Sequence, residues 1–250
     1  MTVELEELIS RITDEVYNRL QTEGNPPPGG QRPSAARYPE TAVRAGTVRA
    51  GVIGVCMDPK STIKAIEAAC GEAKSKHMEL LLVPQWFTEY ACSLLKGTEV
   101  EAATLIGLPG GETSSFAKYA ETKQAVANGA KTVVIPVNMR LCKMGDMDAA
   151  KQDFAESLVA AKGKARVFAL IEAGETGRVS LQDLARMCSS CGAECVLLSY
   201  LTGGRPNAND ISAIAPSGTA VGLYGAIPDK SEYASYQAAG CAYFTEGLGA

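Results

Sequence analysis

The sequence predicts a single (β/α)₈ barrel, a TIM barrel, preceded by an N-terminal segment of different character. From about residue 47 onward, short apolar runs alternate with amphipathic segments, which is the pattern of repeated βα units around a parallel sheet. Eight runs favour a closed barrel over an open doubly wound sheet, and no G-x-G-x-x-G follows any of them to indicate a dinucleotide crevice. The runs span residues 50–57, 78–84, 100–109, 131–138, 165–174, 194–200, 219–226 and 241–247.

The end of the sequence departs from a standard barrel. Only a few residues follow the eighth run, where such a barrel has one more helix to cover its last strand. The sequence supplies none, so we expect that strand to lack its covering helix.

The first 46 residues divide into two parts, ahead of a barrel domain over residues 47–250. Residues 2–20 carry aliphatic side chains at spacings of three and four, which predicts an amphipathic helix over residues 1–20 that Thr2 can cap. Residues 21–46 contain five prolines and four glycines with almost no aliphatic pattern, which predicts a linker. The apolar stripe of the helix consists of Leu5, Leu8, Ile9, Ile12, Val16 and Leu20.

Composition excludes several classes of protein. The 250 residues are 46% hydrophobic and 21% charged, which is ordinary for a globular domain. A net charge of −4 offers no basic surface for a phosphate backbone, so no nucleic-acid partner is expected. No apolar run is long enough for a membrane span, and the N-terminus is acidic where a secretory signal is basic. We therefore expect a cytoplasmic protein without a membrane partner.

The eight cysteines are too few for a disulfide scaffold and are interpreted as reduced, small hydrophobic residues. The one cluster is formed by Cys188, Cys191 and Cys195. A lone C-x-x-C is half of a zinc site, and the only histidine, His77, is distant in sequence. A structural role is favoured over a metal or redox role, and neither a metal nor a cofactor is predicted.

The third and fourth βα units carry a family likeness. Residues 104–146 resemble deoxyribose-phosphate aldolase, whose pattern there is close to TVIGFPxG, then T-x-x-K-x-x-E, then GA before the fourth strand. The likeness extends more weakly from about Ala50 through IEAGE at 171–175 and GAEC at 192–195 to the last strand. The residues in step with the pattern are Thr104, Gly107, Pro109, Gly111, Lys118, Glu121, Gly129, Ala130 and Gly145.

The resemblance implies class I aldolase chemistry. In that family a lysine on the sixth strand forms a Schiff base, a second lysine on the seventh lowers the pKa of the amine, and an aspartate on the fourth assists proton transfer. Alignment on the family motifs places Leu197, Tyr224 and Val134 at these three positions. Ile53 likewise stands at the family's aspartate on the first strand. We therefore name no catalytic residue.

The loss of the lysines does not depend on the register of the alignment. No lysine occurs between Lys164 and Lys230, a span that holds the fifth, sixth and seventh predicted strands. The fourth strand, TVVIPV, contains no carboxylate.

The phosphate pocket implied by the resemblance is altered as well. The family uses a glycine pair after strand seven and a G-x-S-S segment after strand eight, whose backbone N–H groups receive the anion. A proline removes a donor and a glutamate repels a phosphate, so we expect no sugar phosphate in the usual pose. The residues at these places are Ala226, Ile227 and Pro228, then Thr245, Glu246 and Gly247.

Three lysines on loops at the catalytic end of the barrel, Lys60, Lys143 and Lys230, are candidates for a relocated nucleophile. None has a second cation beside it in sequence to lower its pKa, so solvated surface charges are the favoured interpretation.

The candidate ligand-binding residues follow strands four to six. Asn138 and Glu172 end strands four and five, where they either bind a small ligand or satisfy loop backbone. After the sixth strand, an anion nest and a plain turn are both open, and the turn is favoured by the glycine content. The residues of this strand end and loop are Ser199, Gly203, Gly204 and Arg205.

The N-terminal segment has two interpretations. A short amphipathic helix on a Pro/Gly-rich linker resembles the encapsulation peptides that target enzymes to bacterial microcompartments, which bind a shell or core protein through an apolar face. Alternatively, the helix folds back and covers the bare last strand. Recruitment is favoured.

These inferences lead to one hypothesis and two alternatives. The hypothesis is a microcompartment-associated, catalytically degenerate aldolase-like barrel with a binding, scaffolding or regulatory role. The rival is an active lyase on a small aldehyde or phosphosugar that uses relocated residues. A third possibility is a non-covalent carbonyl-processing enzyme, which needs an acid or base that the predicted strands do not supply. The sequence leaves a homo-oligomer open.

Overall fold

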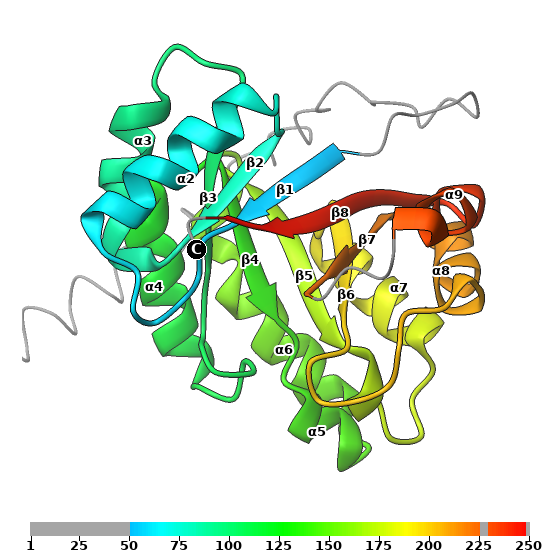
Figure 1. Cartoon of the computed structure of the whole chain (residues 1–250). Coiled ribbons are helices and arrows are strands. Elements are labelled where there is room, and N and C mark those ends of the chain that lie inside the picture. The colour runs from blue at the N-terminus through cyan, green and yellow to red at the C-terminus, as the bar shows by residue number, and fades with distance from the viewer. Residues whose placement is uncertain (1–50, 226–229, 249–250) are drawn as a thin grey trace, which may run out of the picture. The chain divides into compact units, whose positions relative to one another are not determined.

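A closed parallel barrel forms the folded part of the chain. The computed structural model describes residues 51–225 and 230–248, and within these ranges eight strands pair in sequence order, β1 with β2 through to β8 with β1 (Figure 1). This confirms the predicted fold class. The strands are β1 (Gly51–Val55), β2 (Leu80–Val83), β3 (Glu101–Leu105), β4 (Thr132–Pro136), β5 (Arg166–Glu172), β6 (Cys195–Ser199), β7 (Ala220–Tyr224) and β8 (Cys241–Gly247).

Helices connect successive strands, as the alternating pattern of the sequence predicts (Figure 1). Several begin at a side chain that caps the first turn, for example Thr62, Ser114 and Ser180. The helices are α2 (Ile63–Ser75), α3 (Thr88–Leu95), α4 (Ser115–Ala127), α5 (Met139–Lys143), α6 (Met147–Ser157), α7 (Leu181–Cys191), α8 (Ala208–Ile214) and α9 (Tyr233–Ala238), with the short 3₁₀ turns η1 (Gln85–Phe87), η2 (Val159–Ala161), η3 (Ala173–Glu175), η4 (Ala215–Ser217) and η5 (Lys230–Glu232). The N-terminal helix and linker predicted for residues 1–46 lie outside the described residues.

Side chains alternate along each strand between the lumen of the barrel and the layer of helices. The helix-facing residues, such as Val133, Ala169 and Val196, are buried against the surrounding helices. The lumen is filled by a separate apolar cluster, with Leu170 and Tyr224 packed at its edge. Its buried members are Ile53, Leu80, Leu82, Ala103, Leu105, Val134, Phe168, Cys195 and Leu197.

Charged residues close the amino end of the lumen. Arg166, at the start of β5, donates across the barrel to Glu79 and Glu101, each at 2.9 Å. Tyr243 of β8 donates to the same Glu79 at 3.1 Å, and the guanidinium lies 5.5 Å from the ring centre of Phe168. This network of Arg166, Glu79, Glu101 and Tyr243 thus links β3, β5 and β8 with the residue that precedes β2, below the apolar cluster.

The outer face of β1 and β8 lies between α2 and α9 (Figure 1). Phe244 packs against Tyr233 with ring centres 4.5 Å apart, and Leu248 covers Gly54, where a β-carbon would lie 2.7 Å from Leu248 Cδ1. Leu248 is the last described residue. Tyr233 thus covers part of β8 and Leu248 covers part of β1, which lessens the apolar area available to a capping segment.

Loss of the Arg166 cation should destabilise the barrel. Arg166→Met leaves Glu79 and Glu101 without their shared partner, and because these groups are partly exposed we expect a loss of about 1–2 kcal/mol. Chemical denaturation measures the free energy of unfolding. The control is Arg186→Met, which breaks the exposed pair with Asp183 and should cost at most about 0.5 kcal/mol. Equal losses in the two variants would contradict a special role for Arg166.

Candidate functional site

The three positions that align with the family's catalytic residues face the lumen at the carboxyl half of the barrel. Leu197 is 0% exposed and Val134 is 2% exposed, and both belong to the lumen cluster. On β7, Gly222 is the registered partner of Leu197, and a β-carbon on this glycine would lie 2.7 Å from Leu197 Cδ2. The leucine therefore packs tightly at the position that the sequence resemblance aligns with the family's Schiff-base lysine.

Tyr224 lies at the edge of the same cluster. Burial raises the pKa of its phenol, so the group is neutral near pH 7. In the described part of the chain, its hydroxyl makes no hydrogen bond within the protein. A neutral phenol cannot replace the second lysine, because it supplies no positive charge to lower the pKa of a neighbouring amine.

The described strands contain neither lysine nor aspartate in any of the eight. Their acidic residues are Glu101, Glu172 and Glu246. Glu101 belongs to the Arg166 network at the amino end, and Ile53 on β1 is 2% exposed within the lumen cluster. Among the carboxylates of the described strands, Glu172 is therefore the one that ends its strand at the mouth and has no ion pair.

Glu172 and Ser199 fasten the loop that follows β6. Ser199 is 1% exposed and donates its hydroxyl to Glu172 at 2.6 Å, while the Thr202 backbone N–H donates to the other carboxylate oxygen at 3.2 Å. Ser199 is also the registered partner of Tyr224 on β7. The structure thus places Glu172, Ser199 and Tyr224 on three adjacent strand ends, and gives the first two a role in holding loop backbone.

Among the described residues, no hydrogen bond joins the side chain of Asn138 or Arg205 to Glu172, Ser199 or Tyr224. Asn138 caps α5, where its side-chain oxygen accepts from the Leu141 N–H at 3.4 Å. Gly203 and Gly204 both have positive φ, 152° and 85°, as a glycine turn requires. Arg205 follows in the same loop and is exposed.

Two of the three candidate lysines can be placed. Lys143 ends α5 and binds the Glu175 carboxylate of η3, so its ammonium already has an anionic partner. Lys60 lies on the loop between β1 and α2, where its backbone N–H donates to Asp58 at 2.7 Å. Lys230 begins η5, and its side chain lies outside the described part.

The expectation for the phosphate pocket needs one correction. Thr245, Glu246 and Gly247 belong to β8 itself and do not follow it. The Glu246 carboxylate binds Lys76 at the end of α2, because alternation along β8 turns this residue outward. Glu246 therefore cannot repel a phosphate at the mouth. Residues 226–228 lie outside the described residues.

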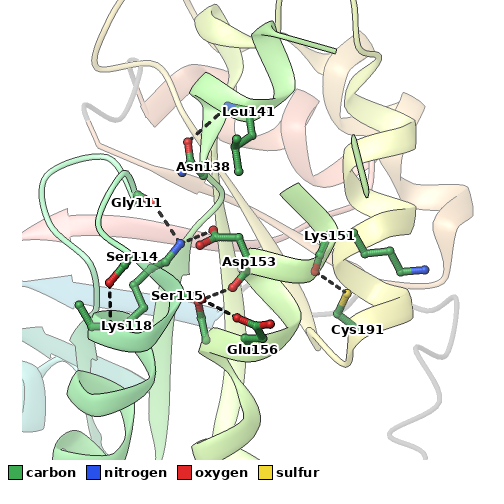
Figure 2. Close-up of polar contacts among 12 residues, drawn as sticks. Gly111, Ser114, Ser115, Lys118, Asn138, Leu141, Lys151, Asp153, Glu156 and Cys191 are labelled. Carbon is green, nitrogen blue, oxygen red and sulfur yellow. Dashed lines mark hydrogen bonds and ion pairs between the residues drawn. The ribbon is translucent and has the colours of Figure 1, made fainter. Parts of the chain in front are cut away.

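Sequence reasoning gave no role to the most buried charge in the described chain. Lys118 of α4 is 0% exposed, donates to the Gly111 carbonyl at 3.0 Å and forms an ion pair with Asp153 of α6 (Figure 2). Burial raises the pKa of the Asp153 carboxyl, and the neighbouring Lys118 opposes that shift. The signal in the sequence was the lysine of the T-x-x-K-x-x-E pattern.

The glutamate of the same pattern holds the other end of the loop between β3 and α4. The Gly107 N–H donates to the Glu121 carboxylate at 2.7 Å, and Gln85 donates to the Glu121 carbonyl at 3.0 Å. At Gly111, with φ 76°, a β-carbon would lie 2.6 Å from the Pro136 carbonyl oxygen. Lys118 and Glu121 therefore clamp a glycine-dependent loop and do not face the lumen.

The cysteines of the described chain are all free. Burial raises the pKa of the Cys188 and Cys195 thiols, so both remain protonated and unreactive. Among the described residues no group of three or more His, Cys, Asp or Glu side chains is placed to hold a metal ion. None of the helices described is long and apolar enough to cross a bilayer.

Comparison with known proteins finds relatives that belong to one family. Deoxyribose-phosphate aldolase 2 of Bacillus licheniformis is 33% identical over 158 residues, which are 62% of this chain and 70% of the relative. The deoxyribose-phosphate aldolase of Clostridium tetani is 31% identical over 153 residues, 59% of this chain and 69% of the relative. No protein-family model matches the chain.

Solved structures share the fold. The aldolase QR15 superposes with a TM-score of 0.72 at 20% identity over 80% of this chain and 90% of its own. The deoxyribose phosphate aldolase from Aeropyrum pernix, described as tetrameric, superposes with a TM-score of 0.70 at 18% identity over 78% and 84% of the two chains.

Closed eight-stranded topology and these superpositions define a (β/α)₈ barrel. The sequence relationship is more specific. The chain belongs to the deoxyribose-phosphate aldolase family.

Removal of Lys118 tests the clamp. Lys118→Met leaves the buried Asp153 without its cation, and we expect a loss of about 3–5 kcal/mol in the free energy of unfolding near pH 7. Without Lys118 the folded-state pKa of Asp153 rises further above its unfolded value, so protonation relieves the penalty as the pH falls through that pKa. The deficit should therefore shrink at acid pH.

Denaturation of wild type and variant across a pH series measures this effect. The double variant Lys118→Met/Asp153→Leu removes both charges and should recover most of the lost stability. A deficit that does not change with pH, together with no recovery in the double variant, would count against the ion pair as the cause.

Proposed function

We propose that this chain is a catalytically degenerate member of its family, with a binding, scaffolding or regulatory role inside a bacterial microcompartment. The proposed loss of catalysis is supported by the absence of lysine from all eight described strands. Leu197 and Val134, which align with the family's Schiff-base lysine and proton-transfer aspartate, are buried in apolar packing. A Schiff base needs an uncharged amine facing the substrate, and these strands supply none.

The packing of the lumen supports the same conclusion. Leu105, Val134 and Leu197 fill the carboxyl half of the barrel, with Leu170 and Tyr224 at its edge. An aldol reaction also needs a group that moves protons, and Glu172 is engaged by Ser199 and Thr202. A ligand at the mouth would therefore meet apolar surface, a neutral phenol and a carboxylate that already accepts two hydrogen bonds.

Recruitment to a microcompartment rests on the N-terminal segment. Its aliphatic stripe, from Leu5 to Leu20, and its Pro/Gly-rich linker suit a helix that binds a shell or core protein by its apolar face. Cover of the outer face of β1 and β8 by Tyr233 and Leu248 favours recruitment over intramolecular capping. A homo-oligomer is compatible with this role, as the tetrameric relative from Aeropyrum pernix illustrates.

Borohydride trapping tests the degenerate assignment. Incubation of the full chain with acetaldehyde and sodium borohydride should leave its intact mass unchanged, because no strand amine condenses with the aldehyde. The aldolase of Bacillus licheniformis, treated in parallel, should gain a reduced adduct. A stable adduct on this chain would overturn the proposal, and peptide mapping would then identify Lys60, Lys143 or Lys230 as the relocated nucleophile.

Deletion of residues 1–20 tests recruitment. The truncated chain should keep the thermal stability of the full chain and lose co-purification with microcompartments, because the segment binds a partner and not its own barrel. Leu8→Asp/Ile12→Asp in the full chain should have the same effect, whereas Asn18→Asp, on the face opposite the stripe, should not. Lower stability with unchanged localisation would establish capping and refute recruitment.

A further inference from the structure

An apolar groove lies on the outside of the barrel, away from the mouth. It runs between the first turns of α4 and the end of α6 with η2, and is lined by Ser115, Phe116, Tyr119, Glu156 and Val159. Phe116 is 66% exposed and Val159 is 49% exposed, although both are large apolar side chains. This small apolar surface is thus exposed and is not used in the packing of the barrel.

One ionised group borders the groove. Glu156 accepts hydrogen bonds from the Ser115 hydroxyl at 2.5 Å and from Gln152 at 2.9 Å, and these bonds lower the pKa of its carboxyl (Figure 2 shows the Ser115 bond). Glu156 has no ion pair within the described residues. Lys118, the nearest cation of α4, is already paired with Asp153. The groove therefore suits an occupant with aliphatic side chains and an adjacent cation.

We propose that this groove binds the N-terminal amphipathic segment of a neighbouring copy of the chain. The segment offers the required chemistry, since Ile12 and Val16 belong to its aliphatic stripe and Arg19 follows Val16 by three residues, which borders the stripe in a helix. Arg19 can then pair with Glu156 while the aliphatic residues cover Phe116 and Val159. This inference rests on the proposed role of the segment as a docking helix.

The proposed docking role, in which the segment does not bind its own barrel, makes a neighbouring copy the occupant's source. The 26 residues at positions 21–46 are enough chain to reach one. A segment that binds the groove of the next copy makes a head-to-tail contact, in which each chain gives one segment and receives another. Such contacts either close into a reciprocal dimer or ring or extend into an open assembly, and in each case the chain associates with further copies.

Sedimentation velocity of the full chain over a range of concentrations tests the proposal. The baseline is the oligomer that Leu8→Asp/Ile12→Asp retains, and wild type should associate beyond it. Phe116→Lys should weaken this further association by at least about tenfold, since it places a charge at the centre of the contact. Val159→Lys provides a second groove variant, and circular dichroism checks that each variant folds. Ile63→Lys, a change at a 57% exposed residue of α2, is the matched control and should behave as wild type.

Mixing gives the decisive measurement. Phe116→Lys keeps a working segment and Leu8→Asp/Ile12→Asp keeps a working groove, so an equal mixture should form a complex limited to one contact per pair. Charge exchange adds a second test, because Glu156→Lys and Arg19→Glu should each weaken association and restore it when combined. No association of wild type beyond the baseline, undiminished association of both groove variants, or no complex in the mixture would overturn the proposal.

The test of the groove can fail or succeed independently of the test of recruitment. If Leu8→Asp/Ile12→Asp abolishes self-association but not co-purification with microcompartments, recruitment fails and the groove assignment stands. If it abolishes co-purification while both groove variants associate normally, the groove assignment fails alone.

Discussion

Closure of the barrel is the constraint on which the rest of the structure depends. Eight parallel strands enclose a lumen that must be filled by side chains from alternate positions, since an empty lumen would cost cavity energy at every layer. Lumen positions on β4, β6 and β7 therefore remain occupied whether or not the barrel performs chemistry. Val134 and Leu197 occupy them as packing residues, and Arg166 closes the amino end with a charge that binds carboxylates from two neighbouring segments.

The family likeness persists most strongly where it supports the fold. Lys118 and Glu121 hold the loop between β3 and α4 from both ends, and Gly107 and Gly111 adopt positive φ within it. Loss of either charged residue would leave a buried polar group unpaired, which costs stability regardless of activity. Lys118 and Glu121 therefore have a structural role that does not depend on any activity of the barrel.

Much of the fold could be predicted from the sequence, since each strand is an apolar run bounded by turns. Strand ends were less certain, because residues such as Ile106 are as buried in a loop as in a strand. The missing lysines were visible without a structure. The clamp role of Lys118 and the outward pairing of Glu246 were not, because both depend on residues distant in sequence, Asp153 and Lys76.

The packing around Gly222 limits which side chains position 197 can hold. Because glycine has no β-carbon, Leu197 and Tyr243 can pack against its backbone. A β-carbon at residue 222 would lie 2.8 Å from the Cβ of Tyr243. A lysine at residue 197 would lose the contact of Leu197 with Gly222 and place an ammonium within the apolar cluster of the lumen, where desolvation is costly. The close approach of the neighbouring strands at Gly222 therefore opposes a charged side chain at this position.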